Sequence, residues 1–182
     1  SSVISCELVG HTSPVWAVAF SPDDRIALSG GGAWQTSQGD NMLRSWSLPD
    51  CELMREMPGH EDIIQDIAFS PDGSTAVTAS ADHTLIRWDL DTGDILRRYG
   101  AGGEEGHTDW VNQVVVHPKG RWMLSGGWDN QLILWDLWTG NVLHHFIGHQ
   151  GPVNGVALAP DGRYATSISD DKTMRVWEIT NA

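Results

Sequence analysis

Short runs of alternating apolar and polar residues fill the chain, and turn residues separate them. Between residues 60 and 100, four such runs cover 63–69, 75–80, 84–90 and 95–100. These runs are rich in β-branched and aromatic residues, which is typical of strands. No stretch of ten residues keeps a helical period. The pattern therefore predicts an all-β chain of short antiparallel strands.

The same pattern recurs four times along the chain. Each copy has a Gly-His pair, a turn such as SPDG from Ser70, and a run such as DHTLIRWDL from Asp82. Extra residues lie within 31–39 of the first copy and within 100–106 before the third. The copies span about 11–56, 60–99, 107–146 and 149–179, and the run 3–9 precedes them. Such a repeat indicates one structural unit used four times.

These three signatures, in this order, resemble those of the WD-repeat β-propeller family over nearly the whole chain. The resemblance implies four blades of four antiparallel strands each. The fourth copy has only three strand-like runs, and residues 3–9 resemble the missing outer one. WD propellers close their ring in this way, so the N-terminal strand is expected to complete the last blade.

Four copies are few for a ring of WD blades, because each would have to turn about 90° rather than about 45° in a ring of eight. A two-fold dimer would close one eight-bladed ring. We therefore expect a homodimer in which each chain's residues 3–9 complete a blade of the partner. A four-bladed monomer and a segment cut from a longer propeller remain the alternatives.

The resemblance also implies a hydrogen-bonded tetrad of His, Ser or Thr, Asp and Trp in each blade. Gly31 and Gly127 occupy the expected hydroxyl position in the first and third repeats, where incomplete networks are expected. The implied members are His11, Asp40 and Trp46; His60, Ser80, Asp82 and Trp88; His107, Asp129 and Trp135; and His149, Ser169, Asp171 and Trp177.

The recurring His, Asp and Ser also suggest a catalytic triad. A catalytic set is needed once per protein, whereas a structural brace is needed once per blade, so we favour the structural interpretation. The sequence has no CxxC, HExxH or carboxylate-rich loop, and adjacent His144 and His145 point to opposite faces of a strand. No catalytic residue, metal or cofactor is expected.

Both insertions fall on one face, the top face, which holds the Gly-His pairs and the turns between second and third strands. The family often presents contact residues there, five residues after the His and just before the turn Asp. By position these are Trp16, Gln65, Asn112 and Asn154, then Gly39, Ala81, Trp128 and Asp170. The partner-binding set predicted from them and from nearby tryptophans is Trp16, Trp34, Trp110, Asn112, Trp128, Asn154 and Asp170.

The remaining tryptophans and the overall charge narrow the picture. Trp122 is expected in blade packing, and Trp138 in a turn on the opposite, bottom face. A net charge of −13 argues against nucleic acid and anionic membrane, which need basic patches. Cys6 and Cys51 form no disulfide framework; we expect them to be reduced and at least half-buried, which favours the cytoplasm.

Three functional hypotheses follow. The first is a non-catalytic scaffold that binds a protein or peptide on its top face. The second is a structural or engineered self-assembling propeller fragment with no dedicated ligand. The third, an enzyme with a site in the central channel, is the weakest, because the sequence offers no nucleophile and base there.

Overall fold

The computed structural model describes residues 6–33, 39–100 and 105–179, and they form fifteen strands in four antiparallel sheets. Sheet 1 holds β1 (Val15–Phe20), β2 (Ile26–Gly31), β3 (Leu43–Ser47) and β4 (Glu52–Met57). Sheet 2 holds β5 (Ile64–Phe69), β6 (Thr75–Ser80), β7 (Leu85–Asp89) and β8 (Ile95–Tyr99). Sheet 3 holds β9 (Val111–Val116), β10 (Trp122–Gly127), β11 (Gln131–Asp136) and β12 (Val142–Ile147). Sheet 4 holds β13 (Val153–Leu158), β14 (Tyr164–Ser169) and β15 (Met174–Glu178).

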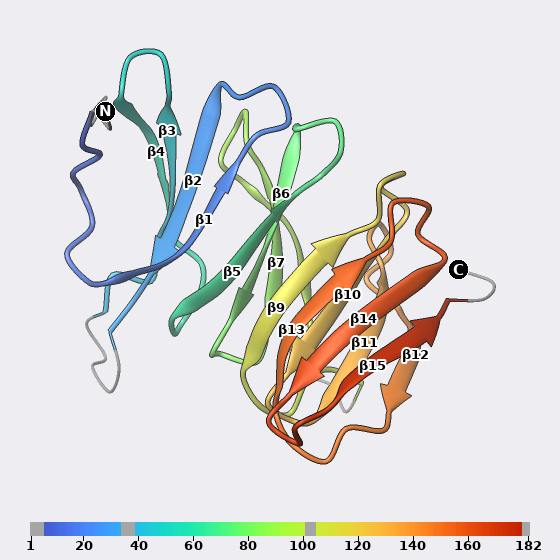
Figure 1. Cartoon of the computed structure of the whole chain (residues 1–182). Coiled ribbons are helices and arrows are strands. Elements are labelled where there is room, and N and C mark those ends of the chain that lie inside the picture. Colours follow the sequence, from blue (N-terminus) through green and yellow to red (C-terminus); the bar gives the residue numbers. More distant parts are fainter. Residues whose placement is uncertain (1–5, 34–38, 101–104, 180–182) are drawn as a thin grey trace, which may run out of the picture.

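Within each sheet the strands follow chain order, as predicted for propeller blades. The first strand of each sheet contacts that of the next, because β1 meets β5, β5 meets β9 and β9 meets β13. In Figure 1 the sheets succeed one another from the left, where the N-terminal segment lies, to the right, where the C-terminal residues lie. Each sheet thus uses one of its faces to pack on its successor.

Three apolar clusters fill the spaces between neighbouring sheets. Leu28 and Leu43 of sheet 1 meet Ile64 and Trp88 of sheet 2 in the first cluster. The second joins sheets 2 and 3, and the third joins sheets 3 and 4. Burial of these side chains is the main driving force that holds the sheets together.

Small residues near the end of the second strand in sheets 1, 2 and 3 allow the next sheet to approach closely. A β-carbon on Gly30 would lie 2.6 Å from Ile64 Cγ2, and one on Gly126 would lie 2.7 Å from Val153 Cγ1. Alanine, Ala79, takes this position in sheet 2. In sheet 4 the position holds Ile168, which is 52% exposed. At this position sheets 1, 2 and 3 are covered by the next sheet, whereas sheet 4 exposes an apolar side chain.

Both outer faces of the series are apolar and open. Sheet 1 exposes Val18 by 72% and Phe20 by 65%, and sheet 4 exposes Met174 by 65% and Val176 by 62%. Sheets 1 and 4 lie at opposite sides of the molecule in Figure 1. The four sheets thus form an open series, and the alternative of a closed four-bladed monomer is wrong for this structure.

The N-terminal segment does not pair with sheet 4 of its own chain. Residues 6–10 form no strand, and the segment lies beside sheet 1 (Figure 1). Residues 3–5, the first part of the predicted closing strand, lie outside the described residues. The prediction that residues 3–9 complete sheet 4 of the same chain is therefore wrong. The N-terminal segment lies beside sheet 1, on the opposite side of the molecule from sheet 4 (Figure 1).

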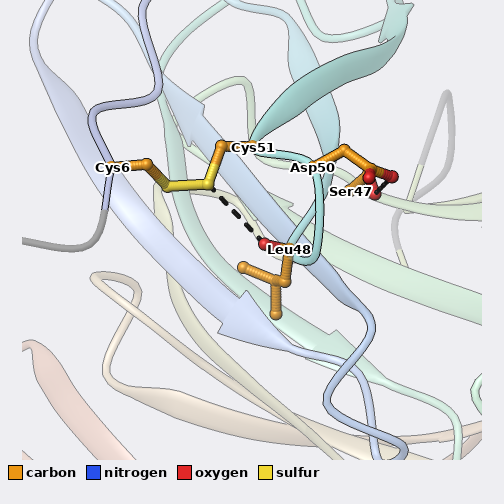
Figure 2. Close-up of a disulfide and its surroundings, with 5 residues drawn as sticks. All are labelled: Cys6, Ser47, Leu48, Asp50 and Cys51. Carbon is orange, nitrogen blue, oxygen red and sulfur yellow. Dashed lines mark hydrogen bonds between the residues drawn. A yellow bond between two sulfur atoms is a disulfide. The ribbon is translucent and has the colours of Figure 1, made fainter.

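The two cysteines form a disulfide, so the prediction that they are reduced is wrong. Cys6 of the N-terminal segment is bonded to Cys51 in the turn between β3 and β4 (Figure 2). Cys6 is exposed and Cys51 is half-buried, with its sulfur 3.6 Å from the carbonyl oxygen of Leu48. The two cysteines are 45 residues apart in the sequence, and no motif indicated that they meet. They are close because the N-terminal segment lies beside sheet 1 (Figure 1).

Candidate functional site

Each sheet contains one buried network of His, hydroxyl, Asp and Trp. In sheet 2, His60 Nδ1 lies 2.7 Å from Asp82 Oδ2, and its Nε2 lies 2.6 Å from Thr78 Oγ1. Trp88 Nε1 donates to the same hydroxyl oxygen at 2.9 Å. Ser125 holds this place in sheet 3 and Ser167 in sheet 4. A satisfied network of this kind fixes the positions of the strands and turns that it joins.

The predicted serines are not the hydroxyls of these networks. Ser80 Oγ donates to the carbonyl of Asp62, and Ser169 Oγ to that of Gly151. Both serines also accept from the amide of the turn aspartate, two residues later. They brace the top-face turns, and the tetrad hydroxyl lies two residues earlier on the same strand.

The expectation of incomplete networks in sheets 1 and 3 is also wrong. Ser29 and Ser125 supply the hydroxyl there, while Gly31 and Gly127 occupy the turn-bracing position. A β-carbon on Gly127 would lie 2.6 Å from His107 Nδ1, so glycine leaves room for the His ring. All four sheets therefore have a complete network.

Sheet 1 adds a buried arginine to its network. Arg44 donates to both oxygens of Asp40, at 2.8 and 2.6 Å, and also pairs with Glu56. Burial, together with the positive charge of Arg44, lowers the pKa of His11. Burial alone would raise the pKa of Asp40, but the hydrogen bonds from Arg44 and from the Thr12 amide hold it below its ordinary value.

The networks are not arranged for catalysis. The side chains of His60, His107 and His149 have no exposed surface. The hydroxyl of Thr78 is fully buried and already accepts the Trp88 proton, so a substrate could not reach it. Among the described residues, no group of three His, Cys, Asp or Glu side chains could hold a metal ion.

The predicted top-face residues of the first strands occupy a repeated β-bulge. In sheet 1 the pairing passes from Val15 with Gly31 to Ala17 with Gly30, and Trp16 is skipped. The same shift skips Gln65, Asn112 and Asn154 in the other sheets. A bulged residue leaves the pairing and its side chain is re-aimed. The bulge therefore takes these four residues out of the strand pairing and changes the direction of their side chains.

Three predicted residues of sheets 3 and 4 form a polar relay. Asn112 Nδ2 donates to the carbonyl of Val153 at 3.1 Å and to Asn154 Oδ1 at 3.3 Å. Asn154 Nδ2 donates to Asp170 Oδ1 at 2.5 Å. Asp170 is exposed at the end of the relay, so a carboxylate is presented to solvent.

The rings of two tryptophans of sheet 3 pack together. The rings of Trp110 and Trp128 are 4.4 Å apart with an interplanar angle of 33°, and the Trp128 amide donates to the Trp110 carbonyl. Trp128 is 38% exposed, while Trp110 is half-buried. The predicted aromatic surface therefore includes one indole face that is open to solvent.

The other predicted tryptophans are placed differently. Trp16 is 49% exposed in sheet 1, and its Nε1 donates to the carbonyl of Gly32. Trp34 lies outside the described residues. Trp122 is buried against His117, as expected for packing, and Trp138 lies in a bottom-face turn. No sequence motif pointed to Arg87, a buried residue whose guanidinium carbon lies 4.0 Å from the centroid of the Trp138 ring.

Comparison with known families matches this architecture. The model described as "WD domain, G-beta repeat" matches residues 2–47, 51–89, 102–136 and 140–178. The chain belongs to the WD-repeat family. The family explains the four-fold recurrence of the network and of the bulge, which the structure shows sheet by sheet.

Several curated WD-repeat relatives resemble parts of the chain. "Small ribosomal subunit protein RACK1y" of Oryza sativa subsp. japonica is 35% identical over 51% of this chain and 26% of its own length. "Nuclear distribution protein PAC1-2" of Uncinocarpus reesii is 27% identical over 95% of the chain and 41% of its own length. "Protein HIR1" of Eremothecium gossypii is 24% identical over 92% of the chain and 16% of its own length. The chain thus spans less than half the length of these relatives.

The structure also bears on membrane insertion. No helix long and apolar enough to cross a bilayer occurs in the described part of the chain.

Proposed function

We propose that this WD-repeat chain is a non-catalytic scaffold that binds a peptide or protein on its top face. The observation that carries the proposal is the bulge that recurs in all four first strands and releases one side chain per sheet from the pairing. The name of a relative in Pyricularia oryzae, "MST50-interacting protein 11", is that of a protein that contacts another.

The chemistry of sheets 3 and 4 favours a basic side chain in the partner. Trp128 offers an indole face, on which an Arg or Lys side chain is stabilised by cation–π attraction. Asp170 precedes the turn of sheet 4 just as Trp128 precedes that of sheet 3, so a carboxylate occupies the equivalent place. A net charge of −13 would also draw a basic partner toward the surface.

A peptide array tests the proposal. We expect wild-type protein to bind a subset of peptides with Arg or Lys beside an apolar residue, and Trp128→Ala and Asp170→Asn each to lose at least ten-fold in affinity. Trp138→Ala is the matched control, since it removes an exposed tryptophan from the bottom face. If Trp128→Ala binds these peptides as well as Trp138→Ala, then Trp128 is not part of a top-face site.

We further propose that two copies close one eight-bladed ring. The support is the pair of open apolar faces, since exposed patches of this kind usually become interfaces and closed symmetry is the usual way to cover them. In that ring residues 3–9 of each chain would complete sheet 4 of its partner. If the chain is instead a segment of a longer propeller, further blades of that protein would cover the same faces.

The second candidate function is that of a self-assembling structural unit with no dedicated ligand. The open end faces favour it, because they alone would explain association of copies. The two candidates differ in one measurement. A ligand-free unit would keep its assembly and show no peptide that distinguishes Trp128→Ala from the wild type.

The cytoplasmic location expected from the sequence rested on reduced cysteines. The disulfide between Cys6 and Cys51 no longer supports a cytoplasmic location, because such bonds persist mainly in oxidising compartments. Titration of free thiols in unfolded, non-reduced protein decides the matter. No reactive thiol is expected in an oxidising compartment, and two would favour the cytoplasm.

A further inference from the structure

A cavity lies on the bottom face, between sheets 2 and 3. It has a volume of about 200 Å³ and opens between two turns of similar sequence, at Pro71 and Pro118. Arg87 and Thr75 of sheet 2 form one side, and Lys119 and Trp138 of sheet 3 form the other. None of these residues belongs to the top-face site.

The guanidinium of Arg87 lies at this cavity without a carboxylate partner. Only 7% of the residue is exposed, its Nε donates to Thr75 Oγ1 at 3.3 Å, and its guanidinium stacks on Trp138. Among the described residues, nothing accepts a hydrogen bond from its two terminal nitrogens, and no ion pair includes it. The terminal nitrogens are not among the buried unpartnered atoms, so they are open to the cavity, where an anion from outside could pair with them.

Arg87 differs in this respect from Arg44, the other arginine that is buried among the described residues. Buried Arg44 is paired with two carboxylates, and exposed Arg163 is paired with Glu178. The positions equivalent to Arg87 in the other sheets hold Ser45, Leu134 and Val176. Blade packing therefore does not require arginine at this place.

The charges around the cavity favour an anion. Lys119 is exposed at the rim and adds a second positive charge. The one carboxylate in the lining, Asp72, is already engaged, because Oδ1 accepts from the Ser70 hydroxyl and from both the amide and hydroxyl of Ser74. These hydrogen bonds lower the pKa of Asp72, so the carboxylate stays ionised, and they hold its Oδ1 in its own turn.

We propose that this cavity binds the carboxylate of a Glu or Asp side chain in a peptide segment of a partner. The planar fork of a guanidinium matches a carboxylate in a bidentate pair, and Lys119 adds attraction at the rim. The apolar parts of Trp138, Pro71 and Pro118 would contact the residues that flank the acidic one. Free phosphate has no apolar group that could contact these surfaces, so the cavity is better suited to a peptide. The bottom face would thus accept an acidic segment while the top face accepts a basic one.

The test is an NMR titration of ¹⁵N-labelled protein, observed at the indole N–H of Trp138. That group donates to the carbonyl of Gly120, which lines the cavity, so its signal reports on occupancy. Trp138→Phe assigns the signal. The probes are acetyl-Leu-Glu-Leu-amide, its isosteric glutamine counterpart and inorganic phosphate.

We expect a saturable shift with the glutamate peptide and at least ten-fold weaker binding of the glutamine peptide. Arg87→Gln should lose binding at least ten-fold, and Arg87→Lys, which keeps the charge but loses the fork, should fall in between. Equal shifts from both peptides would overturn the proposal, as would undiminished binding by Arg87→Gln or a response to phosphate alone. The comparison of the two peptides uses wild-type protein, so it remains decisive even if a variant fails to fold.

Discussion

At the scale of single residues, Thr78 holds two buried side chains together. Its hydroxyl oxygen contacts His60 Nε2 and accepts from Trp88 Nε1, and the residue is completely buried. Substitution by valine keeps the shape but leaves two polar groups unsatisfied, each at a cost of roughly 1–3 kcal/mol.

We therefore expect Thr78→Val to lower the free energy of unfolding by about 3 kcal/mol. Ser80→Ala is the control on the same strand. It removes only the turn-bracing contacts with Asp62 and Asp82 and should cost about 1 kcal/mol. Urea denaturation of both variants measures the difference. An equal loss in the two variants would contradict the central role of Thr78.

The error of two residues in the predicted tetrads has a physical origin. Side chains two positions apart on a strand point to the same face, so Thr78 and Ser80 are equivalent in the alternation of the sequence. The two residues differ only in their position along the strand. Which of them contacts the His ring depends on where the connection before the sheet places that ring. The Asp and Trp positions were predictable because each marks a fixed place relative to its own turn.

Asp66 provides a test of pH dependence between sheets 2 and 3. Burial raises its pKa to about 6, although the amides of Val114 and Ile67 donate to it. The folded protein therefore holds a proton that the unfolded chain has lost between about pH 4 and 6. Because the folded state binds more protons, stability falls as the pH rises through this window.

Asp66→Asn keeps an acceptor for the Val114 amide and removes the charge. We expect it to raise the free energy of unfolding at pH 7 by about 2 kcal/mol and to have almost no effect at pH 4. Urea denaturation at the two pH values measures this. An equal gain at both would show that ionisation of Asp66 is not the cause.

At the scale of elements, the junctions between sheets depend on the size of one residue. Gly126 in β10 faces Val153 and Val156 of sheet 4 so closely that an added β-carbon would lie within 3 Å of each. These neighbours are side chains rather than backbone, so they can yield in part. We expect Gly126→Ala to cost about 1–2 kcal/mol through overpacking.

A double-mutant cycle separates crowding from other effects. Val153→Ala removes the atom that an alanine at 126 would meet, so the double variant should recover part of the loss. Additive losses would show that the cost arises in the strand itself. The small residue was visible in the sequence, but its role was not, because it depends on the approach of a strand from another sheet.

Most elements could be predicted from the sequence. The runs expected at 63–69, 75–80, 84–90 and 95–100 correspond to β5, β6, β7 and β8, because turn signals and β-branched residues mark strands locally. The run 3–9 has the same local features, yet residues 6–10 form no strand here. A strand needs a neighbour, and local pattern does not say which neighbour is within reach.

At the scale of the whole molecule, the open faces of sheets 1 and 4 provide the test of the proposed dimer. Wild-type protein should have twice the chain mass of 20.0 kDa in light scattering, if two copies share one ring. Val18→Glu places a charge on the open face of sheet 1, where the side chain is 72% exposed in the single chain.

This variant should therefore fold normally but have the mass of one chain. Ile147→Glu, at a position that is 77% exposed on β12 of sheet 3, is the matched control and should remain dimeric. A wild-type mass of one chain would contradict the proposed dimer. The open faces would then be explained as contact surfaces for further blades of a longer propeller.

The bulge in the first strand of each sheet has a consequence for how such a protein can change. The bulged residue takes no part in the strand pairing, so the ladder itself does not fix its identity. Here it is Trp, Gln, Asn and Asn in the four sheets, with the same frame around each. Evolution, or a combinatorial library, could vary these four positions together and sample new recognition surfaces while the fold stays constant.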